Sequence, residues 1–172
     1  MKAIVPRPLW LLLSLTMPLC TFAAEITPDS AVSALWRALS NEPGASADMA
    51  TLERLFHADA VVFGGRYEDG SPLVRRKAAK DFLAPYARVS DKGFHECEVS
   101  RSVQAYDRFA VVHSVVESRT DRSAAAPDFV GVNSIQLYRE GPQWKVLSLY
   151  YHVEKPGLPV PLGSGRSGIC IE

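Results

Sequence analysis

The sequence predicts a single α+β domain in which N-terminal helices pack against one face of an antiparallel sheet. Apolar residues recur at helical spacing in the first half of the chain, and from Phe94 onward they alternate with polar residues. A length of 172 residues allows one domain of ordinary size. Helices that precede an antiparallel meander, and do not alternate with its strands, are typical of α+β domains.

Two helices are expected first. Thr27 can cap a helix with Pro28 in its first turn, and the Asn41–Gly44 segment should end that helix. Ser46 or Asp48 can cap the second helix. One face of the second helix is apolar, formed by Met49, Leu52, Leu55 and Phe56.

A short strand and a third helix are expected next. The run Ala60–Phe63 predicts a strand that ends at Gly64 and Gly65. The third helix is predicted over Val74–Pro85, with an apolar face of Ala79, Phe82 and Leu83. We interpret the basic residues on its other face as a solvated surface, namely Arg75, Arg76, Lys77 and Lys80.

Four strands with short connections complete the domain. Their alternating pattern predicts an antiparallel meander over Phe94–Tyr106, Phe109–Thr120, Phe129–Arg139 and Trp144–Val153. Asp107 and Arg108 form a two-residue turn between the first two strands. The domain therefore occupies residues 25–154, and residues 155–172 are expected to run as an extended tail along the surface.

Composition and charge exclude two classes of protein. The 19 Lys and Arg residues balance the 19 Asp and Glu residues, so the chain lacks the basic excess of a nucleic-acid-binding domain. Hydrophobic residues make up 47% of the chain, which is enough apolar surface to offset the entropy lost on folding. We therefore expect an ordered domain with no nucleic-acid partner.

Residues 1–24 have the pattern of a signal peptide. Lys2 and Arg7 precede an apolar stretch, and Thr21 and Ala23 fit the rule for cleavage after Ala23 or Ala24. The stretch is shorter than the roughly 20 helical residues that cross a bilayer, so a membrane anchor is the weaker interpretation. We expect a periplasmic or secreted protein.

Three segments carry a resemblance to a known superfamily: Leu55–Ala60, Gly131–Leu137 and Trp144–Val146. With the order of helices and strands, they resemble the nuclear transport factor 2-like superfamily, including its SnoaL-like members, over about Ala31 to Glu154. The resemblance implies a cone, in which a curved sheet wraps around helices and leaves a pocket at its open end. It implies no activity, because the superfamily includes isomerases, hydrolases, dehydratases, cyclases and pure binding modules.

The strand register predicts which side chains face the pocket. If the turn pairs Tyr106 with Phe109, then the pairs on one face are Ser102 with His113, Glu98 with Glu117, and Glu96 with Arg119. A three-residue turn would reverse every assignment. Continued onto the later strands, this face has a polar rim that also includes Asn133 and Tyr151. Its apolar floor consists of Val111, Val115, Ile135, Leu137, Leu147 and Leu149.

Such a face is typical of a small-molecule site. Our first hypothesis is therefore a binding module without a cofactor, in which Glu96, Arg119 and Asn133 orient a small, partly apolar ligand. In the resembled superfamily, SnoaL-like cyclases and limonene-epoxide-hydrolase-like members tend to carry an Asp on the last strand. This chain has Tyr151 there, and the difference favours binding without chemistry.

Two alternatives remain. One is a cofactor-independent isomerase, lyase or hydrolase, in which Glu98 or Glu117 transfers a proton and His113 or Tyr151 hydrogen-bonds the developing charge. Close carboxylates repel, so one pKa should rise while Arg119 lowers another. The acids could equally form a structural ion-pair network. The second alternative to a binding module is a structural homodimer.

The cysteines predict a disulfide. Cys20 leaves with the signal peptide, so the mature chain keeps Cys97 and Cys170, in a compartment that permits disulfides. Cys97 has opposite parity to Glu96 and Glu98, which places it on the outer face, where the tail can reach it. Neither cysteine has the close spacing of zinc ligands, so no metal is expected.

Overall fold

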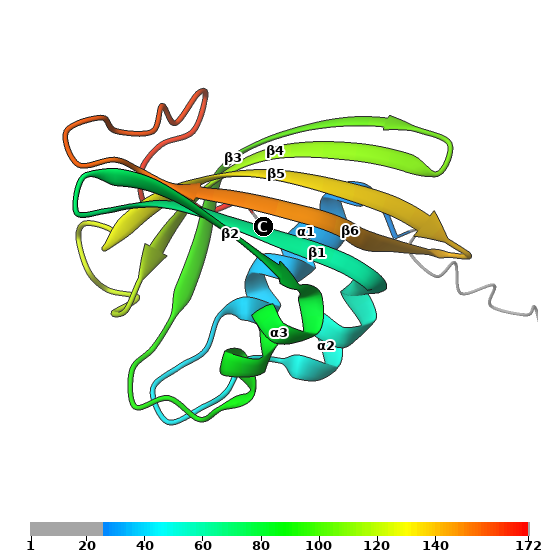
Figure 1. Ribbon diagram of the computed structural model, residues 1–172, viewed down its shortest axis with the longest axis horizontal. Coiled ribbons are helices and arrows are strands. Elements are labelled where there is room, and N and C mark those ends of the chain that lie inside the picture. Colours follow the sequence, from blue (N-terminus) through cyan, green and yellow to red (C-terminus); the bar gives the residue numbers. More distant parts are fainter. Residues whose placement is uncertain (1–25, 172) are drawn as a thin grey trace, which may run out of the picture.

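The computed structural model describes residues 26–171, which form three α-helices, a short 3-10 helix and a six-stranded sheet (Figure 1). The signal peptide expected at residues 1–24 lies outside the described residues. Within 26–171, no helix is long and apolar enough to cross a membrane. The helices lie on one face of the sheet, so the predicted α+β class is confirmed.

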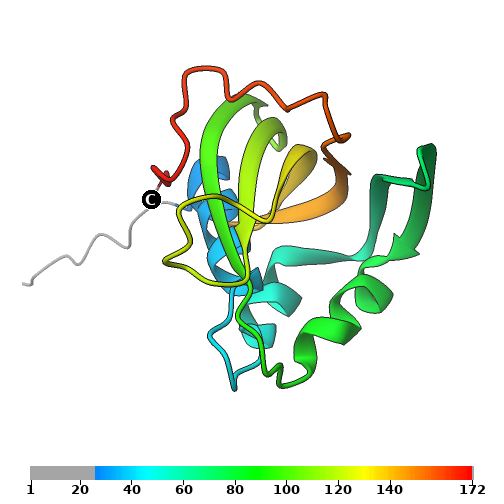
Figure 2. The same ribbon diagram turned by 90° about the vertical axis from the view of Figure 1, so that its left-hand side faces the viewer.

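The strands are arranged in the order β2-β1-β6-β5-β4-β3. Neighbouring strands are antiparallel except for β1 and β6, which are parallel. Figure 2 shows the sheet curving around α1. The elements are α1 (Pro28–Leu39), α2 (Met49–Leu55), β1 (Phe56–Glu68), β2 (Ser71–Ala78), α3 (Ala79–Leu83), the 3-10 helix η1 (Ala84–Ala87), β3 (His95–Tyr106), β4 (Phe109–Arg119), β5 (Phe129–Glu140) and β6 (Gln143–Val153).

Helix α1 begins at the predicted cap. The Ser30 N–H donates to Thr27 Oγ1 at 3.1 Å, and the Thr27 N–H donates to Ser30 Oγ at 2.9 Å, so two backbone groups at the helix start are satisfied. The apolar face of the helix is buried against the sheet and consists of Val32, Leu35, Trp36 and Leu39. This face forms one wall of the interior.

The third helix begins later than predicted. Residues 71–78 form strand β2, and α3 includes only Ala79–Leu83. Asp69 and Gly70 both have positive φ, of 50° and 79°, which is the conformation of a type I′ hairpin turn. This turn pairs Glu68 with Ser71, and pairing then continues along β1. The predicted short strand at Ala60–Phe63 is consequently part of the longer β1.

A β-bulge changes the predicted register of β3. The turn pairs Tyr106 with Phe109 as expected, and pairing follows the prediction as far as Ser102 with His113. One extra residue at Val99 then shifts the register by one position. The pairs beyond the bulge are Glu98 with Val116, Cys97 with Glu117, Glu96 with Ser118 and His95 with Arg119.

The C-terminal tail lies against the outer face of the sheet (Figure 2). Val160 and Leu162 pack on an outer apolar cluster of Cys97, Val99, Val115 and Val130. A Cβ atom at Gly165 would lie 2.1 Å from the Val99 carbonyl oxygen, so only glycine permits this approach. Cys170 forms the predicted disulfide with Cys97, with a Cα–Cα distance of 5.0 Å.

Candidate functional site

A pocket of about 400 Å³ lies between the helices and the inner face of the sheet. Helices α1 and α3 and the 3-10 helix η1 contribute large apolar and aromatic side chains, and β3 to β6 contribute the opposite wall. Its polar side chains are few: Arg66, Tyr86, Glu96, Ser118, Asn133 and Tyr151. The other lining residues are Trp36, Leu39, Phe82, Phe94, Val116, Phe129, Gly131, Leu149 and Val153.

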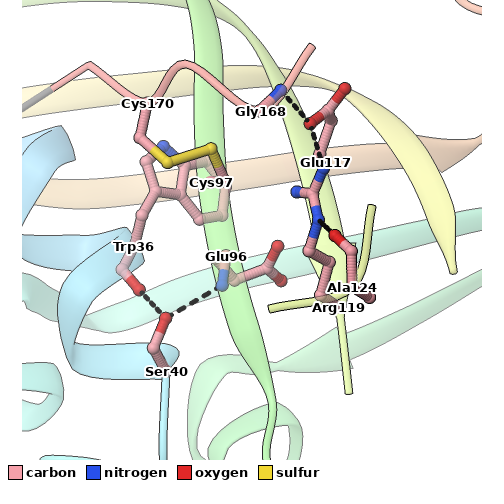
Figure 3. The surroundings of a disulfide bond; sticks show 9 residues. All are labelled: Trp36, Ser40, Glu96, Cys97, Glu117, Arg119, Ala124, Gly168 and Cys170. Carbon is pink, nitrogen blue, oxygen red and sulfur yellow. Dashed lines mark hydrogen bonds and ion pairs between the residues drawn. A yellow bond between two sulfur atoms is a disulfide. The ribbon is translucent and has the colours of Figure 1, made fainter. Parts of the chain in front are cut away.

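Glu96 is the acid of this pocket. Its backbone N–H donates to Ser40 Oγ at 3.0 Å, and that hydroxyl donates to the Trp36 carbonyl oxygen at 2.8 Å, so the end of α1 fixes the strand at this residue (Figure 3). The Ser118 hydroxyl donates to Glu96 Oε2 at 2.8 Å. Burial raises the pKa of Glu96 to about 7, although the Ser118 hydrogen bond opposes this increase. Both protonation states are therefore accessible near neutral pH.

Aromatic rings surround the part of the pocket near Glu96. Phe82 lies between Tyr86 and Tyr151, with centroid distances of 5.4 Å and 6.2 Å. Burial, together with the nearby acid, raises the pKa of Tyr86 above its usual value. Its hydroxyl therefore stays protonated and can donate or accept a hydrogen bond.

Gly64 gives Tyr151 its position. The two residues are opposite each other on β1 and β6, and a Cβ atom at Gly64 would lie 2.4 Å from the Tyr151 hydroxyl. The absence of a side chain at Gly64 therefore lets the tyrosine ring lie across β1. The predicted strand end at Gly64 and Gly65 is thus a mid-strand site of close packing.

Solved structures match this fold, whereas no protein-family model and no curated protein matches the sequence. An NTF2-like protein from Cytophaga hutchinsonii superposes with a TM-score of 0.54 at 15% identity, over 72% of this chain and 93% of that chain. The protein has the nuclear transport factor 2-like (NTF2-like) fold. The fold predicted from the resemblance is confirmed.

Two further structures share the NTF2-like fold. A protein of unknown function with a cystatin-like fold from Nostoc punctiforme has a TM-score of 0.53 at 16% identity, over 78% of this chain and 98% of that chain. A candidate ketosteroid isomerase from Parabacteroides distasonis has a TM-score of 0.50 at 18% identity, over 77% and 91% of the two chains. At these identities the similarity is one of fold alone.

The structure places only some of the predicted pocket residues in the pocket. Glu96, Asn133 and Tyr151 line it, and Asn133 lies opposite Tyr151 on neighbouring strands of the NTF2-like sheet. The Asn133 amide nitrogen donates to the Ser114 and Gly131 carbonyl oxygens at 3.3 Å and 3.4 Å. Of the predicted floor, Ile135, Leu137 and Leu149 are buried on the inner face, whereas Leu147 is partly exposed at a bulge.

The odd-numbered residues of β4 face outward, away from the pocket. The predicted pocket positions are therefore wrong for five residues: Val111, His113, Val115, Glu117 and Arg119. The prediction placed Glu117 opposite Asn133, but the long loop between β4 and β5 pairs Glu117 with Val130. This odd-numbered shift reverses the parity of β4 relative to β5. His113 is exposed on the outer face.

Glu117 and Arg119 form a buried ion pair beneath the tail. Arg119 Nη2 lies 2.8 Å from Glu117 Oε2, and the same oxygen accepts the Gly168 N–H at 2.9 Å (Figure 3). Burial raises the pKa of this carboxyl, but the hydrogen bonds from the tail and from Arg119, with the charge of Arg119, outweigh burial and hold the pKa below its usual value. The pair therefore fastens the tail to β4.

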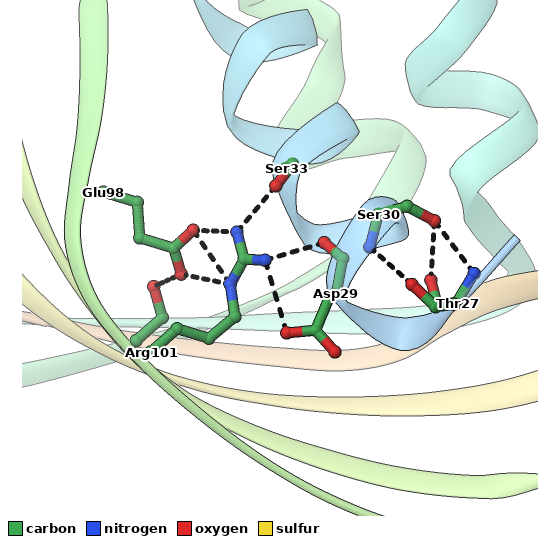
Figure 4. Close-up of polar contacts among 7 residues, drawn as sticks. Thr27, Asp29, Ser30, Ser33, Glu98 and Arg101 are labelled. Atoms are coloured by element: carbon green, nitrogen blue, oxygen red, sulfur yellow. Dashed lines mark hydrogen bonds and ion pairs between the residues drawn. The ribbon is translucent and has the colours of Figure 1, made fainter. Parts of the chain in front are cut away.

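Glu98 is buried on the inner side but outside the pocket lining. It forms an ion pair with Arg101 (Figure 4). The Ser114 hydroxyl donates to Glu98 Oε1 at 2.6 Å. Arg101 also donates to the Asp29 carbonyl oxygen at 2.8 Å and to Ser33 Oγ at 2.9 Å, so it joins β3 to α1. Arg101 was not among the site residues predicted from the sequence.

The expected pair of opposed acids is absent from the sheet within residues 26–171. Glu98 and Glu117 are on opposite faces, each beside its own arginine. Over the same residues, no group of three or more His, Cys, Asp or Glu side chains could hold a metal ion.

Proposed function

We propose that the protein binds a small, mainly apolar molecule in the pocket between the helices and the inner face of the sheet. The observation that carries this proposal is a cavity of about 400 Å³ with aromatic and aliphatic walls and few polar groups. Pockets of this size and composition are typical of small-molecule sites. The neighbours of the same fold are compatible with this function.

Glu96 and Asn133 are the groups placed to orient such a ligand. A protonated Glu96 donates a hydrogen bond to a ligand carbonyl, whereas its ionised form accepts one from a hydroxyl or amine. Because its pKa is about 7, the preferred ligand group changes with pH. Arg119, expected to share this role, lies on the outer face under the tail.

A variant whose new side chain fills the pocket tests the proposal. A Cβ atom at Gly131 would have only one neighbour within 4 Å, at 3.8 Å, so Gly131→Leu extends a side chain into the pocket. Ser134→Leu on the exposed outer face of the same strand is the matched control. Ligands found by native mass spectrometry should raise the melting temperature of the wild type and of Ser134→Leu, but not of Gly131→Leu. Equal shifts in all three proteins would contradict binding in this pocket.

A second candidate function, acid–base catalysis, is favoured by Glu96. A carboxyl with a pKa of about 7 in an apolar pocket is poised to transfer a proton near neutral pH. Tyr86 and Tyr151 line the same pocket and carry hydroxyl groups that can hydrogen-bond a developing charge. The neighbour named a candidate ketosteroid isomerase makes ketosteroids reasonable first test compounds.

Glu96→Gln separates the two functions. The amide keeps the shape of the side chain but cannot transfer the proton, so a catalyst loses turnover while ligand affinity stays within about tenfold. The rate of the wild type should change near pH 7 if Glu96 is the acid or base. Turnover that survives in Glu96→Gln would refute catalysis by this residue and leave binding as the function.

We also propose that the protein acts outside the cytoplasm. The Cys97–Cys170 disulfide supports this location, because such bonds persist in oxidising compartments. The signal-peptide pattern of residues 1–24 agrees with it. Intact-mass analysis of exported protein should find a chain that begins at Ala24 or Glu25, and a chain retaining residues 1–24 in the cytoplasm would contradict export.

A further inference from the structure

A second, smaller hollow of about 100 Å³ adjoins the pocket beside the β1–β2 hairpin. Arg66, Phe82 and Tyr151 line both cavities, so the two meet at these side chains. Figure 2 shows the hairpin next to α3. The smaller hollow differs from the pocket in its chemistry, because Arg75 and Lys77 join Arg66 in its lining.

The register of the hairpin turns these three cations to one face. Gly64 lies opposite Arg75 and Val62 lies opposite Lys77, and Arg66 follows Gly64 by two residues. Side chains two residues apart share a face of a strand. Because Val62 is buried in the main core, this is the inner face of the sheet. The cations therefore face the same side as the pocket.

One acid offsets part of this positive charge. Glu68 lies 3.1 Å from Arg66 Nη2 and 3.7 Å from Arg75 Nη2, so the two guanidinium groups share a single carboxylate. Lys77 has no ion pair among residues 26–171. The side chains of Arg66 and Arg75 remain 50% and 60% exposed, so their charged groups are accessible to a ligand.

We propose that the ligand of the pocket is an amphiphilic oxyanion, whose apolar body lies among the aromatic side chains and whose anionic group binds Arg66, Arg75 and Lys77. This inference rests on the proposed binding function and names its ligand class. Guanidinium groups hold carboxylates through paired, charge-assisted hydrogen bonds, and lysine adds a point charge. Tyr151 and Phe82, shared by both cavities, contact the ligand where its apolar part meets its charged end.

Matched probes test the charge preference. Calorimetric titration of the full chain with decanoate against decanol, and with naphthaleneacetate against naphthaleneethanol, compares acids with neutral analogues of similar shape. At low ionic strength we expect each acid to bind about tenfold more tightly than its alcohol, a difference that salt should reduce. In Arg75→Gln/Lys77→Gln the preference should disappear, because the acids bind more weakly.

Arg76→Gln is the matched control, because Arg76 lies between the two substituted residues and points to the opposite face of β2. It should keep the preference for acids. Alcohols that bind as tightly as acids, or a preference that survives in Arg75→Gln/Lys77→Gln, would overturn the inference while leaving the binding function intact. If neither member of either pair binds, both the inference and the proposed function are overturned for ligands of this kind.

Discussion

Glu96 shows how position alone changes the chemistry of a residue. Glu96 and Glu98 are two residues apart on β3, yet Glu98 is neutralised by Arg101, whereas within residues 26–171 the Ser118 hydroxyl is the only side-chain partner of the Glu96 carboxyl. Burial without a cationic partner favours the protonated form and raises the pKa of Glu96 from 4.5 to about 7. Because of this difference, Glu96 is a pocket acid that is partly protonated near neutral pH.

The raised pKa of Glu96 predicts a pH dependence of stability. Below pH 4.5 the carboxyl is protonated in both folded and unfolded chains, so its ionisation does not reduce the free energy of unfolding. Between pH 4.5 and 7 only the unfolded chain loses the proton, so the free energy of unfolding falls as pH rises, by about 3 kcal/mol in total. The side chain of Glu96→Gln stays neutral, so this fall in the free energy of unfolding should be absent from the variant. Urea unfolding from about pH 4 to about pH 8 measures the difference.

Glu140→Gln, at the exposed end of β5, is the control for that measurement. Its profile should follow that of the wild type. If Glu96→Gln and the wild type lost stability in parallel across this range, the carboxyl of Glu96 would have an ordinary pKa and the case for acid–base chemistry would lose its basis.

At the scale of elements, alternation of apolar and polar residues was enough to predict β3 to β6 and the turn between β3 and β4. It could not predict which face each strand presents. The extra residue at Val99 and the length of the β4–β5 loop both change parity, and neither leaves a local pattern in the residues. Of the residues predicted to face the pocket, Asn133 and Tyr151 therefore line it, whereas His113 and Glu117 lie on the outer face.

The β1–β2 hairpin was missed for another reason. Asp69 and Gly70 form the turn dipeptide typical of hairpins, but the basic run after it resembles a solvated helix face. Pairing along β1 outweighed the local preference of that run. Consequently, Arg75 and Lys77, interpreted from sequence as solvated, lie beside the pocket.

The attachment of α1 to β3 gives a prediction at the same scale. Arg101 and Glu98 are both nearly inaccessible, with side chains 6% and 2% exposed. Arg101→Leu removes the bonds to α1 and leaves a buried carboxylate without its cation, so we expect a loss of about 3 to 5 kcal/mol in the free energy of unfolding. Glu98→Leu/Arg101→Leu removes both charges and should lose less.

Chemical denaturation measures both variants. The order of the two is decisive. A double variant less stable than Arg101→Leu would mean that the uncompensated charge of Glu98 is not the source of the loss.

At the scale of the molecule, the two faces of the sheet pack against different parts of the chain. The inner face and the helices form the pocket, and the outer face near the bulge is covered by the tail. The disulfide was predictable because it needed only the parity of Cys97 and the reach of the tail. The hydrogen bond from the Gly168 N–H to Glu117 was not, because it depends on how the loop from β4 to β5 sets the register.

Removal of the disulfide tests how far this bond holds the tail on the outer face. The disulfide joins residues 73 positions apart, so Cys97→Ser/Cys170→Ser should reduce the free energy of unfolding by about 4 kcal/mol in the chain-entropy model. The tail should then be cleaved faster by proteases, because its end loses a covalent attachment and is held through the hydrogen bonds of Gly168 to Glu117 and of Ile171 to Glu98. Wild-type protein with reductant should behave like the double variant, whereas unchanged stability and cleavage in both would show that the tail is held without the bond.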